Sequence, residues 1–181
     1  MAGVFKEAVL TAKGIALLAK AGRCTIKLTK AATGDGSYSD GEALTNRTAL
    51  KSKKQEFALI TVTTQNQSNV YVKFIITNKQ DTGNLKNGYY VKEVGIYAQD
   101  PDEGEILYAL AVGVANQWDY MPAYNDLLPS TITMDFLTEV ANATDVTIVT
   151  PNSMYLYDQT TGDKYVLGVD KGLLYYEEVE E

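Results

Sequence analysis

The sequence predicts a β-dominated α+β protein, an antiparallel sheet or sandwich with one short N-terminal helix and a small C-terminal β-meander. Val, Ile, Thr and Tyr are abundant, and 13 Tyr residues stand against 4 Phe and 1 Trp. These residue types are enriched in strands. Short apolar runs separated by turn residues recur along the 181-residue chain, whereas a helical pattern occurs only near its start.

The helical pattern covers residues 12–21. Thr11 precedes it and can cap the helix, because a threonine hydroxyl accepts a hydrogen bond from a first-turn amide. The apolar face expected to pack on the core consists of Ile15, Leu18 and Ala19. Lys13 and Lys20, seven positions apart, are expected on the opposite side.

Strands are predicted at 25–29, 57–64, 70–77, 91–98, 106–112, 131–137 and 145–150. The clearest hairpin joins 91–98 to 106–112 through an acidic turn that contains Pro101 and Gly104, the residues that turns of this kind require. An exposed loop is expected at 37–47. Trp118, Tyr120 and Tyr124 fall in a later aromatic loop.

Two domains are predicted, residues 1–150 and residues 151–181. The second contains three short strands, at 154–158, 165–169 and 173–179, with turn residues between them. Three strands of this length are marginally stable alone. We therefore expect this Tyr-rich meander to pack on the main domain, on copies of itself or on a partner. Its tyrosines are Tyr155, Tyr157, Tyr175 and Tyr176.

The sequence argues against an enzyme and against any cofactor or metal. His is absent and Cys24 is the single cysteine, so neither a His-dependent nucleophile nor an ordinary zinc site can be assembled. Asp100, Asp102 and Glu105 lie in or beside a turn where solvated acids are expected. The acidic stretch 35–42 does not match a calcium loop, because Asp40 stands where that loop needs Gly.

Charge and hydropathy exclude two further classes of partner. The net charge of −7 and the isolated lysines at 51–54 argue against nucleic acid. Charged residues interrupt the N-terminal apolar stretch, so we expect neither a signal peptide nor a membrane-inserted helix. We therefore expect the protein to be synthesised in the cytoplasm.

Glu93 has two interpretations at this stage. It lies inside a predicted strand between apolar neighbours, and an outward or edge position explains it simply. Alternatively, it is a buried or interface carboxylate paired with a cation such as Arg47 or Arg23.

Several segments resemble, in order, the N-terminal domain of phage tail-collar fibre proteins. Residues 11–19 resemble the pattern T-x-x-G-x-x-x-L-A, and residues 32–36 resemble its V-G-D-G turn. Residues 90–98, YVKEVGIYA, are similar to the hallmark I-R-E-I-G-L-Y, and GEILYA follows the acidic turn. The closing strands, with VANA before VTI, also fit. The resemblance covers about residues 1–150.

The resemblance implies a structural protein of the virion tail, in contractile-tailed phages or phage-tail-like bacteriocins. In this family the domain anchors a fibre to the baseplate, and the fibres are generally trimeric. The resemblance assigns no catalytic residues to this sequence. Members usually continue into a long shaft, whereas only the meander follows here. We therefore expect a short attachment protein that links the baseplate to a tail fibre or receptor-binding protein.

Two other hypotheses remain open. In the first, exposed aromatic residues stack on sugars, and the chain is a carbohydrate-binding module that contacts host surface glycans. In the second, the chain is an enzyme that uses carboxylates alone. Candidate interface residues are Glu93, Gly95, Trp118, Tyr120, Tyr124, Tyr155, Tyr157, Tyr175 and Tyr176.

Overall fold

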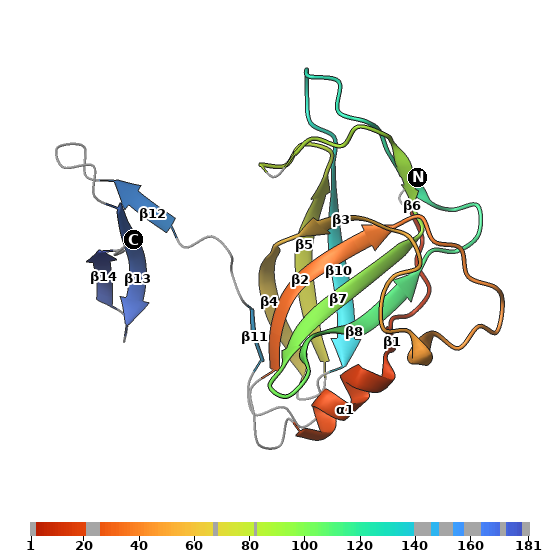
Figure 1. The fold of residues 1–181 in the computed structure, drawn as a ribbon, viewed down its shortest axis with the longest axis horizontal. Coiled ribbons are helices and arrows are strands. Elements are labelled where there is room, and N and C mark those ends of the chain that lie inside the picture. The colour runs from red at the N-terminus through yellow and green to blue at the C-terminus, as the bar shows by residue number, and fades with distance from the viewer. Residues whose placement is uncertain are drawn as a thin grey trace. The chain divides into compact units, whose positions relative to one another are not determined.

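The computed structural model describes residues 3–20, 26–66, 69–81, 83–139, 146–148, 154–157, 164–170 and 173–178. The chain divides into two compact units, residues 1–149 and residues 150–181 (Figure 1). Each unit is described by itself.

Two sheets build the larger unit. The first has the order β1 (Val9–Leu10), β8 (Gly104–Val112), β7 (Glu93–Asp100), β2 (Ile26–Gly34) and β11 (Val146–Ile148), and β3 (Lys53–Phe57) also pairs with β2. The second has the order β10 (Thr131–Glu139), β5 (Asn69–Thr77) and β4 (Leu59–Asn66). All these pairings are antiparallel except that of β11 with β2. The β-dominated fold class is therefore confirmed.

Three smaller elements complete this unit. The helix α1 (Ala12–Lys20) precedes β2, and a short 3-10 helix spans Leu44–Asn46. Strands β6 (Tyr89–Val91) and β9 (Asp119–Met121) form a separate two-stranded ribbon. β3, β6 and β9 were not predicted as separate strands. The expected strand at 91–98 is interrupted at Lys92, because β6 ends at Val91 and β7 begins at Glu93.

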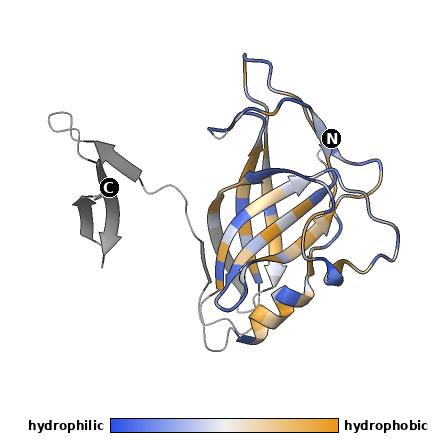
Figure 2. Cartoon of the chain, in the orientation of Figure 1, coloured by the Kyte–Doolittle hydropathy of each residue, from blue (hydrophilic) through white to orange (hydrophobic). Residues whose placement is uncertain are grey.

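The main core lies between the two sheets. It combines Leu28 and Ile96 of the first sheet with Val72 and Phe74 of the second, all fully buried. Buried and exposed residues alternate along β5, as expected for a sheet with one face on the core. Figure 2 shows hydrophobic and hydrophilic stretches interspersed along the strands of the larger unit.

The outer face of the first sheet is covered as well. Helix α1 lies against β8, and a second small cluster, in which Leu50 packs with Leu110 and Val112, lies beneath the loop between β2 and β3. Seven consecutive residues of β8 are buried for this reason.

Helix α1 begins as predicted but buries a different face. The Gly14 amide donates to Thr11 Oγ1 at 3.0 Å, which confirms the Thr11 cap. A Cβ at Gly14 would collide with the Tyr108 carbonyl oxygen, so the helix rests directly on the β8 backbone. Gly14 and Leu17 are buried, whereas Ile15 is 49% exposed. Of the predicted face, Leu18 is half-buried and packs against the core, whereas Ile15 and Ala19 are exposed. The prediction was wrong for these two residues, because the close contact at Gly14 sets the rotation of the helix.

The two helix lysines contact the acidic turn between β7 and β8. Lys20 Nζ lies 2.9 Å from both oxygens of Asp100 and 2.9 Å from Asp102 Oδ2. Lys13 pairs with Glu103. The Asp102 amide donates to Asp100 Oδ1 at 2.8 Å, and Asp100 is only 2% exposed. The expectation of a solvated acid was therefore wrong for Asp100.

This ion pair shifts both pKa values. The hydrogen bonds that Lys20 donates to Asp102 and Asp100 raise the pKa of Lys20 above its usual value. The hydrogen bond from Lys20 lowers the pKa of Asp100, and backbone amides act in the same direction.

The smaller unit contains a three-stranded antiparallel sheet. Its order is β12 (Met154–Tyr157), β13 (Lys164–Asp170) and β14 (Leu173–Glu178). The predicted meander is confirmed. For this sheet the structure describes the strands but not the side chains. In the described residues, no helix is long and apolar enough to span a membrane.

Asp100→Asn is expected to lower the free energy of unfolding at pH 7 by about 1–3 kcal/mol, because Lys20 loses a charged acceptor. The folded pKa of Asp100 is lowered, so its stabilisation is present above the unfolded pKa of about 3.9 and is lost as pH falls through the folded value. Urea unfolding at pH 7 and at pH 2.5 measures both.

Asp102→Asn is the matched control. This side chain is 73% exposed and should contribute at most about 1 kcal/mol. An Asp100→Asn penalty as large at pH 2.5 as at pH 7 would show that the ion pair is not its cause.

Candidate functional site

Glu93 lies at the centre of a network that fixes the loop between β2 and β3. Its side chain is fully buried. Oε1 accepts hydrogen bonds from the amides of Gly36 at 3.1 Å and Ser52 at 2.7 Å. Oε2 accepts from the Lys51 amide at 2.9 Å and from the Tyr38 hydroxyl. The carboxylate therefore holds both ends of the loop against the start of β7.

The structure contradicts one sequence interpretation of Glu93 and confirms only the burial that the other expected. An outward or edge position was wrong, because the side chain is buried. The partners are backbone amides and a hydroxyl, and within the described residues no cation pairs with it. The Arg47 guanidinium instead lies over the Tyr38 ring at 6.0 Å. Arg23 lies outside the described residues.

Three glycines make room for this network. A Cβ on Gly34 or on Gly36 would lie 2.5 Å from Glu93 Oε1. A Cβ on Gly95 would lie 2.7 Å from Leu107 Cδ1 and 3.0 Å from Leu50 Cδ2. Gly95 thus lets Leu50 of the loop pack onto the sheet. Both Glu93 and Gly95 lie inside the larger unit rather than on its surface.

Tyr38 packs over the carboxylate it binds. Burial raises the pKa of its hydroxyl, and the hydrogen bond to Glu93 raises it further. The Lys51 ammonium lies 4.5 Å from the centre of the Tyr38 ring, within range of a cation–π contact. The phenol is therefore a neutral donor to Glu93 across the ordinary pH range.

The acidic side chains of the loop do not converge on one point. Asp35 pairs with Lys54 at 3.2 Å and Glu42 pairs with Lys51 at 2.7 Å. Among the residues with described positions, no group of three potential metal ligands forms. The loop therefore offers ion pairs where a calcium site was considered.

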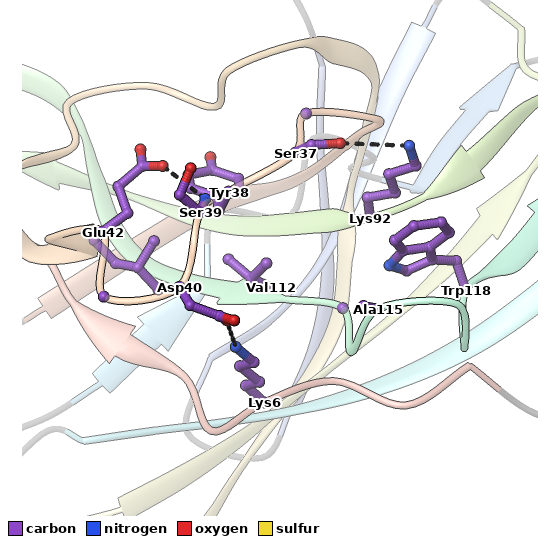
Figure 3. Close-up of a pocket in the computed structure, with 14 residues that line it drawn as sticks. Lys6, Ser37, Tyr38, Ser39, Asp40, Glu42, Lys92, Val112, Ala115 and Trp118 are labelled. Atoms are coloured by element: carbon purple, nitrogen blue, oxygen red, sulfur yellow. Dashed lines mark hydrogen bonds and ion pairs between the residues drawn. The ribbon is translucent and has the colours of Figure 1, made fainter.

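A shallow pocket of about 140 Å³ lies beside this loop (Figure 3). Lys6 and Asp40 line one side, and Lys92 and Trp118 line the other. Lys92 Nζ lies 4.5 Å from the centre of a Trp118 ring and 3.5 Å from Ser37 Oγ. One face of the indole is therefore covered by the protein's own cation.

The β6–β9 ribbon next to this pocket carries an exposed aromatic cluster. Tyr90 and Tyr120 are directly paired across the two strands, with ring centres 5.1 Å apart, and Trp118 lies 6.2 Å from Tyr90. Tyr90 is 50% exposed and Tyr120 is 54% exposed. Trp118 and Tyr120 were candidates from the sequence. Tyr90 was missed, because only the long-range pairing of β6 with β9 brings it to them.

The loop that follows β9 places two leucines in solvent. Leu127 is 77% exposed and Leu128 is 81% exposed. The base of this loop is held by Asn78, whose side chain donates to the Pro122 carbonyl at 3.1 Å and accepts from the Ser130 amide at 2.9 Å. We call Tyr90, Tyr120, Leu127 and Leu128 the aromatic–leucine surface.

The remaining candidates lie elsewhere. Tyr124 is half-buried and contacts Lys79, whose ammonium is 5.7 Å from the ring centre. The four tyrosines of the smaller unit lie on β12 and β14, where side chains are not described. They therefore stay predictions.

A family model described as phage tail-collar fibre protein, N-terminal, matches residues 1–173. The chain belongs to the phage tail-collar fibre family. The match extends beyond the expected boundary at 150 into the smaller unit. Comparisons with curated proteins and with solved structures give no match. This tail-collar fibre chain is accordingly a structural component of the phage tail.

The structure explains the segments that resemble the family. In this tail-collar fibre domain Thr11 caps α1 and Gly14 seats it on β8. Gly36 and Glu93 join the loop to β7. These residues stabilise the fold, whereas Tyr90, the first residue of the resembling segment 90–98, is exposed.

Glu93→Gln is expected to destabilise the tail-collar fibre domain by about 2–4 kcal/mol. The glutamine NH₂ group would face hydrogen-bond donors, from which the carboxylate now accepts hydrogen bonds. Urea unfolding measures the loss. Limited proteolysis should show faster cleavage within residues 37–47.

Glu7→Gln is the control, since Glu7 is exposed. A Glu93→Gln protein as stable and as protease-resistant as this control would contradict the role assigned to the carboxylate.

Proposed function

We propose that this tail-collar fibre protein joins the baseplate to a tail fibre or receptor-binding protein. Residues 1–149 form the attachment domain in this proposal, and the smaller unit contacts another fibre or baseplate protein. The proposal also includes a contractile tail and a homotrimer. The observation that carries it is that the ribbon strand β6, which bears Tyr90, lies at the end of β2. β11, the last described strand of the larger unit, lies at the start of β2.

The direction of β2 defines these two ends. β11 runs parallel to β2 beside Ile26–Leu28, at the start of that strand. The Lys92 amide, which directly follows β6, donates to the Gly34 carbonyl at the end of β2. Gly34 is six positions after Leu28, which corresponds to about 20 Å along a strand. A partner can therefore bind the ribbon end without meeting β11 (Figure 1).

The aromatic–leucine surface has the composition of a protein contact. Tyrosines are enriched at interfaces because they offer apolar area with few rotatable bonds. The Asn78 side chain donates one hydrogen bond and accepts another at the base of the leucine loop, so less conformational entropy is lost when a partner binds. Because the chain belongs to a tail-fibre family, we expect its partner to be another tail protein.

Host glycan binding is a second candidate, favoured by the pocket beside Trp118. Its lining includes hydroxyl, carboxylate and ammonium groups that could bind a sugar. However, Lys92 covers one face of the indole, and Tyr90 is tilted by 58° against Trp118. A sugar needs an open ring face, so protein attachment explains the surface better.

Tyr90→Ser combined with Leu127→Ser is expected to reduce incorporation into tails at least about tenfold, because each change removes exposed apolar contact area. Incorporation is measured by adding purified protein to tail particles assembled without this chain and quantifying the amount that sediments with them. Circular dichroism checks that the variant folds.

Ile15→Ser is the matched control. Ile15 is 49% exposed on α1, away from the ribbon, and should not affect incorporation. Wild-type protein that failed to sediment with tails would contradict the proposed function. Glycan-array binding that is lost in Trp118→Ala, with incorporation unchanged, would favour the second candidate.

A further inference from the structure

Strand β10 has one unpaired edge. It pairs with β5 along its whole length, from Thr131 opposite Thr77 to Glu139 opposite Asn69. Within the described ranges it pairs with no other strand. The segment before α1 lies near this free edge, but that segment bonds to β8, through the two residues of β1 and a bridge between Phe5 and Gly113. The two sheets are thus not joined on this side.

A groove of about 400 Å³ occupies the gap. Residues 5–8 line one wall and residues 134–138 line the other, in both cases without a break. Side chains of a strand alternate between faces, so consecutive lining residues mean that the edge of the backbone itself borders the groove. Unpaired backbone groups at such an edge are a template for another strand.

Thr138 supplies an independent observation. It is 4% exposed, lines the groove, and its Oγ1 has no hydrogen-bond partner among the described residues. The buried threonines Thr11 and Thr33, in contrast, bond to Leu107 and Tyr89. An unsatisfied buried hydroxyl is costly. The groove therefore contains a buried polar group that a bound molecule can satisfy.

We propose that this groove binds an extended strand from a partner tail protein, which adds to the free edge of β10 and hydrogen-bonds to Thr138 Oγ1. Five residues of β10, Met134 to Thr138, span about 16 Å, enough for a short strand. The bound strand would connect β10 to the segment before α1 and so join the two sheets. This inference rests on the proposed attachment function and names a second contact for it.

The groove also indicates the composition of the strand. Phe136 and Met134 lie on the inner face of β10, which suits small or apolar residues at alternate positions. Glu7 and Asp135 stand at the rim, and Asp135 already pairs with Lys73 at 3.6 Å. A basic residue at an outward position of the incoming strand would complement Glu7.

Thr138→Val separates a binding role from a structural one. Valine keeps the shape of threonine but has no hydroxyl, so the isolated protein should be as stable as wild type or more stable. Sedimentation with tail particles that lack this chain should fall about three- to tenfold. Thr133→Val, at an exposed position of β10, should change neither measurement. Unchanged sedimentation of Thr138→Val would contradict the proposal.

Hydrogen exchange locates the strand directly. Amides of residues 134–138 and 5–8 should exchange more slowly in reconstituted tails than in isolated protein. Ala8→Trp, which fills the groove, should reduce sedimentation at least about tenfold, and Ala16→Trp on the exposed side of α1 should not. Normal sedimentation of Ala8→Trp without new amide protection would overturn the inference.

The possible failures can be told apart. Wild-type protein that does not sediment with tails contradicts the proposed function itself. Protection at residues 134–138 that appears in isolated protein as its concentration rises would mean that a second copy fills the groove, which contradicts a partner protein as the occupant.

Discussion

The buried carboxylate of Glu93 is the interaction on which the rest of the larger unit depends. Three backbone amides and the Tyr38 hydroxyl bond to it, so a single strand residue fixes residues 36–38 and 51–52 together. Charged acceptors form stronger hydrogen bonds than neutral ones, which explains how four donors stabilise this buried charge although no cation among the described residues pairs with it. Once the loop is fixed, Leu50 can cover the outer face of β8, and Lys92 reaches both Ser37 and Trp118.

The opposite end of the same hairpin is held by a second charged contact. Asp100 follows Glu93 along β7 and is buried beneath Lys20 of α1. The helix itself rests on β8 at Gly14. β7 therefore carries one buried carboxylate at each end, one bound to the loop and one to the helix. This arrangement covers the outer face of the sheet while the ribbon of β6 and β9 stays exposed.

Local patterns in the sequence predicted local structure well. The Thr11 cap, the acidic hairpin and the C-terminal meander depend on neighbouring residues and were confirmed. The partners of Glu93 are 41 to 57 residues away, so strand alternation could not reveal its burial. The same holds for Asp100, because Lys20 lies 80 residues earlier. The missed strands β6 and β9 are short, and their pairing is what brings Tyr90 to Tyr120.

These contacts stabilise the larger unit, while Tyr90, Tyr120, Leu127 and Leu128 stay exposed and available for the attachment that we propose. Site-specific photo-crosslinking in intact tails tests this most directly. A crosslinker at Tyr90 should capture another tail protein, whereas one at Ala16 on α1 should capture none. Crosslinks from Ala16 alone, with Tyr90 unreacted in assembled tails, would contradict attachment through the ribbon end.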